Sequence, residues 1–172
     1  ACTRKTAWGL MDKWAVHIGG GLTHRLSRSD ALMIKENDLC VIAPDGNLES
    51  SIPFAISSID FNSNAMFTVI EVQDSDQAIL AASAWSENQK TRNGLEPLVI
   101  LLDNMGPSAC GRTDEDLRKL ELREWCILEG SGGVNRGDLS AWASMSGVDV
   151  ISSSEVNMGS KPLDFSMLIG DA

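Results

Sequence analysis

Short apolar runs alternate with amphipathic segments along this 172-residue chain. Five runs have the length and aliphatic content of buried strands, and they occupy residues 31–34, 66–72, 97–102, 125–128 and 148–151. Helix-like patterns mark other segments, at residues 9–16, 77–85, 114–122 and 138–143. Strands that alternate with helices predict βα units with a parallel sheet, and therefore an α/β fold.

Two polar stretches interrupt this alternation. Residues 43–64 are rich in Ser, Asn and Asp, and we expect a surface loop around one helix. Residues 86–96, SENQKTRNGLE, are predicted to be an insertion before the next strand.

Thr113 is predicted to cap the helix that follows it, because acids fill the first turn of that helix. Without an internal repeat or a linker, we expect one domain over residues 1–172.

The chain is strongly acidic. It carries 24 Asp and Glu residues against 14 Lys and Arg, for a formal net charge of −10. This charge argues against nucleic acid or an anionic membrane as the main partner. No apolar run is long enough to span a membrane.

Cysteine spacing indicates the redox setting. The four cysteines are far apart and form no C-x-x-C pair, at Cys2, Cys40, Cys110 and Cys126. We therefore expect reduced thiols, with neither a disulfide framework nor a zinc site. This favours a cytoplasmic protein, with the matrix of a mitochondrion or plastid as the alternative.

Positive charge is concentrated in the first 35 residues, which hold six of the 14 Lys and Arg and only two acids. Their formal charge is +4, so the remaining residues carry −14. A basic cluster within an acidic chain predicts a pocket for a small, multiply charged anion. The alternative is a set of ordinary surface cations. The candidate side chains are Arg4, Lys5, His24, Arg25 and Lys35.

Polar side chains follow four of the predicted strands closely, at Lys35, Glu71, Asp103 and Ser131. In parallel α/β folds, ligands bind at the carboxyl ends of the strands. One pocket could therefore collect all four side chains. The alternative for each acid is a strand-end residue that only caps a loop.

Two loops are candidates for phosphate binding. Glycines let backbone N–H groups approach a phosphate closely, and serine adds a hydroxyl. The first loop is Ser131-Gly132-Gly133, and its partner after the next strand contains Ser153 and Ser154. Most such Ser-Gly-Gly segments are simple turns, so the position after a strand is what favours phosphate. Three further glycines, at residues 19–21, predict close packing or a tight turn after the first helix instead.

Nine short blocks carry a family resemblance. They read TRKT (3–6), GGG (19–21), HR (24–25), IKEN (34–37), IEV (70–72), LLDN (101–104), EGSGG (129–133), GVDVIS (147–152) and PLDFS (162–166). In this order they resemble the C-terminal catalytic domain of quinolinate phosphoribosyltransferases, also called nicotinate-nucleotide pyrophosphorylases (carboxylating). The resemblance covers nearly all of the chain.

The resemblance implies an incomplete, TIM-like α/β barrel of parallel strands that lacks the family's first strand and N-terminal domain, and hence a domain of a longer chain. It also implies a reaction. Quinolinate and phosphoribosyl pyrophosphate would give nicotinate mononucleotide, pyrophosphate and CO₂ in NAD biosynthesis, with Mg²⁺. The partners would be these small anions and further copies of the chain, in a homodimer or higher oligomer.

The resemblance assigns roles to matching residues. Quinolinate would be held by Arg4, Lys5, His24, Arg25 and Lys35. Catalysis would involve Lys35, Glu71 and Asp103, and the two acids would contact the ribose hydroxyls and Mg²⁺, directly or indirectly. Phosphate would be bound by Ser131, Gly132, Gly133, Ser153 and Ser154.

Some positions depart from the family pattern. Asp38 stands where the family has histidine, and Met11 stands where most members have arginine. In the second phosphate loop, many members have Gly followed by Ala-Leu-Thr-His, whereas this chain has SEVNM at residues 154–158. These departures affect the expected affinity for phosphate more than that for quinolinate. The negative charge of Glu155 would repel a phosphate if the side chain pointed into the site.

Two other functions stay open at this point. One is a non-catalytic relative that serves as an accessory subunit of a larger, organellar complex. The other is a related phosphoribosyltransferase for a different pyridine or pyrimidine acid.

Overall fold

A single parallel sheet organises the chain. The computed structural model describes residues 8–43, 46–61, 65–164 and 166–167. The strands are β1 (Leu32–Ile34), β2 (Thr68–Val72), β3 (Leu98–Asp103), β4 (Cys126–Ser131) and β5 (Val150–Ile151), side by side in chain order. All four neighbouring pairs are parallel. The five predicted strands are confirmed, and the described strands do not close into a ring, as in an incomplete barrel.

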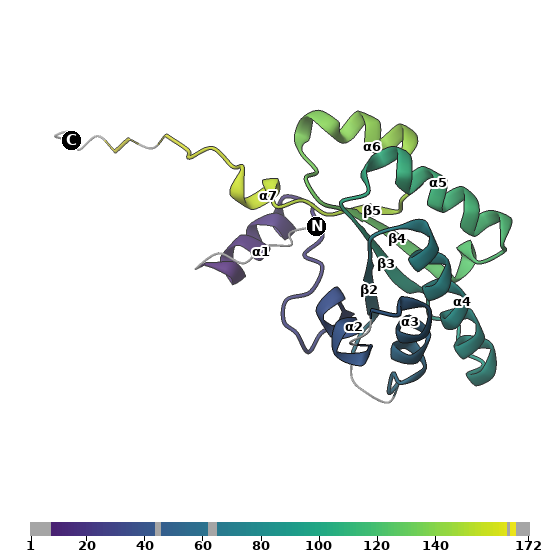
Figure 1. The fold of residues 1–172 in the computed structure, drawn as a ribbon. Coiled ribbons are helices and arrows are strands. Elements are labelled where there is room, and N and C mark those ends of the chain that lie inside the picture. The colour runs from purple at the N-terminus through teal and green to yellow at the C-terminus, as the bar shows by residue number, and fades with distance from the viewer. Residues whose placement is uncertain (1–7, 44–45, 62–64, 165, 168–172) are drawn as a thin grey trace.

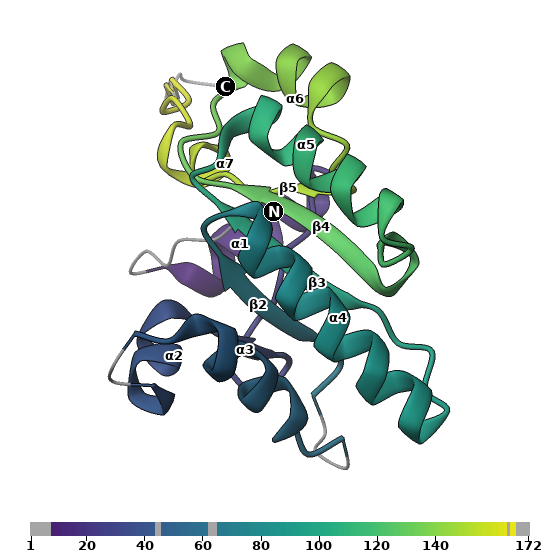
Figure 2. The same cartoon turned by 45° about the vertical axis from the view of Figure 1, so that its right-hand side comes forward.

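Helices lie on both sides of this sheet, and most of them lie on one face (Figure 1). They are α1 (Gly9–Ile18), α2 (Glu36–Ile42), α3 (Leu48–Ser57), α4 (Ser75–Arg92), α5 (Gly106–Lys119), α6 (Leu139–Met145) and α7 (Glu155–Met158). Two short 3-10 turns, η1 (Arg123–Trp125) and η2 (Arg136–Asp138), precede β4 and α6. Helices α4, α5 and α6 lie along the same face, as Figure 2 also shows, whereas α1 lies beside α7 on the other side. Among the described residues, no helix has the length and apolar composition needed to cross a bilayer.

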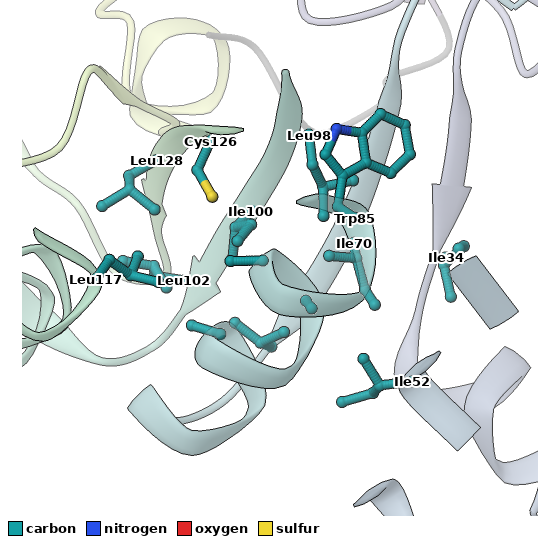
Figure 3. Packing of buried hydrophobic residues seen from close by; sticks show 14 of the residues in the cluster. Ile34, Ile52, Ile70, Trp85, Leu98, Ile100, Leu102, Leu117, Cys126 and Leu128 are labelled. Atoms are coloured by element: carbon teal, nitrogen blue, oxygen red, sulfur yellow. The ribbon is translucent and has the colours of Figure 1, made fainter. Parts of the chain in front are cut away.

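Strand alternation divides the apolar residues between two clusters. The large core lies between the sheet and the helices, and Ile70, Ile100, Leu128 and Trp85 all belong to it (Figure 3). The small cluster occupies the opposite face and centres on Val69, Val99 and Leu101. Because successive side chains of a strand point to opposite faces, the residues between the core positions face away from the helices.

The predicted start of the fifth helix is wrong. Helix α5 begins at Gly106, with proline at the next position, so Thr113 lies in its middle. The Thr113 hydroxyl donates to the Ala109 carbonyl at 3.1 Å and meets the Ser75 hydroxyl at 2.6 Å. Asp114, the acid after Thr113, forms an ion pair with Arg118 and does not lie at the start of the helix. Proline in the first helical turn was the stronger start signal.

The predicted insertion at residues 86–96 is also wrong. Helix α4 continues to Arg92 and ends at Asn93, whose left-handed φ of 54° suits a helix C-terminus. The polar composition was misleading because Ser86 and Gln89 are buried against the core. The stretch 43–64 likewise contains α3, the one helix expected there, but Ile52 and Ile56 of that helix belong to the core.

Helix α2 was not predicted. Of the two roles expected for the glycines at residues 19–21, the structure shows the tight turn. Gly20 has a φ of 84°, and the Gly21 N–H donates to the Val16 carbonyl at 2.8 Å. This turn closes α1 and directs the chain towards the carboxyl ends of the strands. Of the five tryptophans, Trp85 and Trp142 are buried in the core and Trp125 packs against it, while Trp14 on α1 and Trp8 just before α1 are exposed.

Candidate functional site

An open pocket of about 640 Å³ lies at the carboxyl ends of the strands. Lys35, Glu71, Asp103 and Ser131 all line it. The expectation that one pocket collects these four side chains is confirmed, and it follows from the topology. Parallel strands end at the same edge of the sheet, so residues at or just after the carboxyl ends of neighbouring strands come close together.

Register fixes which side chains meet in the pocket. Asp103 stands opposite Ser131 in the β3–β4 pair, and Glu71 stands opposite Leu101 in the β2–β3 pair. Asp103 and Leu101 are two positions apart and therefore point to the same face. Because Leu101 belongs to the small apolar cluster, the polar site and this cluster share the face away from the covering helices.

Lys35 and Glu71 form an ion pair at the pocket. The Lys35 ammonium donates to the Glu71 carboxylate. The Lys35 side chain is 47% exposed and that of Glu71 is 17% exposed, so the cation is open to a ligand. The backbone N–H of Lys35 donates to the Asp38 carboxylate at 2.8 Å, which holds the start of α2. The family's histidine position therefore carries a helix-capping acid in this chain.

Asp103 is held by its neighbour in sequence. The Asn104 amide donates to the Asp103 carboxylate at 2.8 Å, and the Asn104 backbone N–H donates to the Ser131 carbonyl at 2.9 Å. Asn104 adopts a left-handed φ of 57°, which asparagine tolerates better than most residues. In the sequence, Asn104 belongs to a motif block and carries no sign of a structural role. In the structure it connects the Asp103 carboxylate to the Ser131 loop.

The basic side of the pocket is formed by His24, Arg25 and Arg28 together with Lys13. The Arg25 guanidinium donates to the Ala31 carbonyl at 2.9 Å, which places it against the segment before β1. Arg4 and Lys5, the other predicted quinolinate ligands, lie outside the described residues. In the sequence, Lys13 and Arg28 contribute to the positive charge of the first 35 residues but match no motif of the pocket.

Lys13 is a buried cation in α1. Its ammonium donates to the Thr23 carbonyl at 2.7 Å and to the Arg25 carbonyl at 2.6 Å. Two carbonyl acceptors partly satisfy the charge and fix the backbone on both sides of His24. Helix α1 therefore positions the His24-Arg25 segment at the mouth of the pocket.

Asp30 organises the loop that carries Ser27 and Arg28. Its carboxylate accepts hydrogen bonds from the backbone N–H groups of Leu26 at 2.9 Å and Ser27 at 2.7 Å, and from the Ser27 hydroxyl at 2.9 Å. The hydrogen bonds from Ser27 hold the pKa of Asp30 below its ordinary value. The carboxylate thus stays ionised at neutral pH and keeps this loop folded beside the pocket.

Both predicted phosphate loops border the same pocket, which is lined by residues 131–134 and 152–154. Gly132 and Gly133 have φ angles of 91° and 63°, a backbone that side chains rarely adopt. The Ser153 hydroxyl donates to the Val134 carbonyl and accepts from the Glu155 N–H, so it joins the two loops.

Glu155 is turned towards backbone rather than towards the pocket. Its carboxylate accepts a hydrogen bond from the Arg136 backbone N–H at 2.5 Å. Glu155 is absent from the residues that line the described pocket. The acid that departs from the family pattern thus serves as an acceptor for η2.

Glu129 is the functional candidate that sequence reasoning missed. It is 2% exposed, lies on β4, and contacts both His24 and Ser152. Within the sequence it was part of a motif block and carried no signal of its own. Only the fold reveals its partners, since His24 lies 105 positions away in the chain.

The pocket brings together cationic side chains, carboxylates and a glycine-rich backbone that is suited to binding phosphate. Within the described ranges, no group of three or more His, Cys, Asp and Glu side chains is placed to hold a metal ion. Glu71 and Asp103 are two carboxylates in one pocket, and Mg²⁺ commonly uses one or two carboxylates together with substrate phosphates and water. The donor set therefore fits Mg²⁺ bound jointly with a phosphorylated ligand.

Comparison with known proteins identifies the relatives of this chain. The family model described as "Quinolinate phosphoribosyl transferase, C-terminal domain" matches residues 1–168. A "Probable nicotinate-nucleotide pyrophosphorylase [carboxylating]" of Methanothermobacter thermautotrophicus is 35% identical over 98% of this chain and 55% of its own length. A protein of the same name from Archaeoglobus fulgidus is 36% identical over 98% of this chain and 58% of its own length.

Solved structures agree with the sequence relatives. The crystal structure of NadC from Streptococcus pyogenes matches with a TM-score of 0.70 and 29% identity, over 96% of this chain and 51% of that chain. The chain therefore spans about half the length of the relatives it matches.

Proposed function

The chain belongs to the quinolinate phosphoribosyltransferase family, which it matches as a C-terminal domain, and from this membership we propose that the protein makes nicotinate mononucleotide. The substrates are quinolinate and phosphoribosyl pyrophosphate, and the other products are pyrophosphate and CO₂. One observation carries the proposal: Lys35, Glu71, Asp103 and the glycines after Ser131 converge on one pocket. Residues 1–172 act as a single catalytic domain.

The basic side of the pocket binds quinolinate. This substrate has two adjacent carboxylates, and the guanidinium of Arg25 offers a planar fork that suits one of them. His24 and Lys35 supply further donors along the same wall. Arg4 and Lys5, outside the described residues, are assigned to the same ligand by the family motif. Together these cations orient the pyridine nitrogen towards the ribose carbon.

The carboxylates act on the ribose. As pyrophosphate leaves with the bonding electron pair, positive charge develops on the ribose carbon and ring oxygen. The negative charges of Glu71 and Asp103 favour this transition state, because they are fixed before the reaction begins. The backbone of Gly132 and Gly133, with the hydroxyls of Ser131 and Ser154, binds the phosphate groups.

Glu71 and Asp103 would also hold Mg²⁺. When bound, this ion neutralises charge on the departing pyrophosphate. Loss of CO₂ from the ring completes the reaction, and the carbon that loses it takes up a proton. The basic side of the pocket stabilises the negative charge that develops during that loss.

The test is turnover by the full-length protein. We expect quinolinate, phosphoribosyl pyrophosphate and Mg²⁺ to give nicotinate mononucleotide and CO₂ in equal amounts. Nicotinate and orotate, offered in place of quinolinate, test the related transferases and should give little product. A folded, full-length protein that binds neither substrate would overturn the proposal in favour of the accessory subunit, which the relatives named above do not support.

We also propose that the protein works as a homodimer or higher oligomer, with a larger complex as the alternative. Helix α1 and the preceding Trp8 support this, because they expose the large apolar side chains of Trp8, Leu10, Met11, Trp14 and Ile18. We expect Trp14→Glu to lower the molecular mass measured by light scattering. An unchanged mass, with intact folding, would contradict a role for this face in assembly.

The setting we propose is the cytoplasm, or alternatively an organelle matrix. Burial raises the pKa of Cys110 to about 11 and that of Cys126 to about 12, so both stay as thiols. The redox state of the two cysteines can be checked by thiol titration of freshly isolated, unfolded protein. Full oxidation would contradict a reducing compartment.

A further inference from the structure

Glu129 is a buried carboxylate to which the reaction described above gives no role. It lies on β4 opposite Leu101, and its side chain is 3% exposed. Glu129 and Ser131 are two positions apart, so both face the pocket side of the sheet. Burying a carboxylate is costly unless it is paired and hydrogen-bonded. Its partners should therefore show why the fold keeps it.

Both carboxylate oxygens of Glu129 have donors. His24 Nε2 lies 3.1 Å from one oxygen, and the Ser152 hydroxyl donates to the other. Burial raises the pKa of Glu129, but the hydrogen bonds from His24 and Ser152 outweigh burial and hold that pKa below its ordinary value. Glu129 is thus ionised, and it bridges the basic side of the pocket and the second phosphate loop.

His24 is fixed from several directions. Its φ is 59°, a conformation that residues other than glycine rarely adopt and that persists only where the surroundings impose it. The Lys13 ammonium binds the carbonyls before and after His24, and the Phe67 ring meets the imidazole edge-on at 5.9 Å between centroids. A carboxylate acceptor at Nε2 adds control of the ring's rotation and keeps a proton on that nitrogen.

We propose that Glu129 is a positioning residue that sets the His24 imidazole for a carboxylate of the pyridine substrate. Glu129 acts through His24 and does not touch the substrate. This inference rests on the proposed function, since it assigns His24 to quinolinate. The role of Glu129 therefore differs from that proposed for Glu71 and Asp103, which act on the ribose.

A double-mutant cycle in the full-length protein tests the proposal. Glu129→Gln keeps the shape and removes the charge, and His24→Asn removes the ring at a backbone angle that asparagine tolerates. Calorimetry measures the Kd for quinolinate and, separately, for inorganic pyrophosphate. We expect Glu129→Gln to weaken quinolinate binding by about 10-fold, while pyrophosphate binding changes by less than about threefold. In the His24→Asn background, Glu129→Gln should cause no further loss.

Asp114→Asn is the matched control, because Asp114 is a buried, ion-paired acid that lies outside the pocket. It should lower stability and leave the quinolinate Kd unchanged. If Glu129→Gln does not fold, Glu129→Asp replaces it: the charge stays, but the carboxylate withdraws by one methylene, and quinolinate binding should again weaken. For either variant, wild-type affinity for quinolinate overturns the proposal.

Additive losses in the cycle also overturn it, because they mean that Glu129 acts independently of His24. If the wild-type protein binds pyrophosphate but not quinolinate, the proposed function itself fails and this inference with it. If the wild-type protein binds quinolinate and the Glu129 variants match it, only this inference fails.

Discussion

The Lys35 ammonium donates a hydrogen bond to the Glu71 carboxylate, from the residue after β1 to the neighbouring strand β2. The pair sits at the pocket rather than in the core, and its cation is half exposed. At the edge of a pocket, the two charges of an ion pair can each contact a different group of the same ligand. The ammonium can turn to an anionic group, while the carboxylate faces the positive charge that develops on a ribose.

Lys35→Ala should remove most of the turnover. A single fixed charge that favours the transition state is commonly worth about 100-fold in rate, and this substitution also leaves Glu71 without its cation. The measurement is the steady-state rate of the full-length protein at saturating substrates. Thermal unfolding is the control for folding. Lys35→Arg keeps the charge on a larger group and should retain part of the rate, whereas a near-normal rate for Lys35→Ala would refute a catalytic role.

Gly132→Ala should weaken phosphate binding. A Cβ at this position would lie 2.2 Å from the Asn104 side-chain oxygen and 2.7 Å from the Asn104 Cα, and φ is 91°. The first phosphate loop must then shift, and Asn104 also holds Asp103. We expect the Kd for inorganic pyrophosphate to rise by about 10-fold in calorimetry.

Gly133→Ala is the matched control for that experiment. Gly133 also has a positive φ, of 63°, but a Cβ there meets nothing within 4 Å. Gly133→Ala should therefore lower the free energy of unfolding by about 1 kcal/mol through backbone strain. It should weaken pyrophosphate binding less than Gly132→Ala does. Equal effects of the two substitutions would mean that the contact with Asn104 has no part in binding.

Sequence patterns predicted the strands and the convergence of their ends, because both follow from local features. An apolar run of four to seven residues defines a strand, and the residues at or just after its carboxyl end must reach the edge of a parallel sheet. Lys35, Glu71, Asp103 and Ser131 were found in this way.

Partners distant in the sequence could not be predicted in the same way. Glu129 lies within a strand and bonds to His24 from a different part of the chain. Lys13 has helical spacing but donates to carbonyls beyond the glycine turn. Gln89 is polar, and yet tertiary packing buries it, which concealed the length of α4. Each case depends on a contact that no local pattern encodes.

Asp114→Asn should destabilise the protein and reduce its sensitivity to acid. Asp114 accepts hydrogen bonds from Arg118 at 2.8 Å and from Arg123 at 2.6 Å. Burial raises the pKa of Asp114, but these arginines outweigh burial and hold the pKa below its ordinary value. The stabilisation is therefore complete above about pH 4, and it is lost as the pH falls through the folded-state pKa.

At pH 7 the free energy of unfolding of Asp114→Asn should fall by about 2 kcal/mol, as measured in urea. Below pH 4 the difference from wild type should shrink. Asp116→Asn is the control on the same helix, since the Asp116–Lys119 pair is exposed and should contribute less than about 1 kcal/mol. A constant difference between wild type and Asp114→Asn at all pH values would contradict ionisation of Asp114 as the cause.

Gln89→Met should leave stability unchanged or raise it. Gln89 is fully buried, and neither atom of its amide has a hydrogen-bond partner in the part of the chain that the structure describes. An unpaired buried amide is costly, so an apolar side chain of similar length should raise the free energy of unfolding by up to about 1 kcal/mol.

The neighbouring Asn88 provides the comparison, because its amide donates to the Ile56 carbonyl at 3.3 Å between α4 and α3. Asn88→Leu should lower the free energy of unfolding by about 1 kcal/mol, since it leaves a carbonyl without its donor. Urea unfolding of both variants gives the sign of each change. A loss above about 1 kcal/mol for Gln89→Met would mean that the amide is hydrogen-bonded in the folded protein, for example to a buried water.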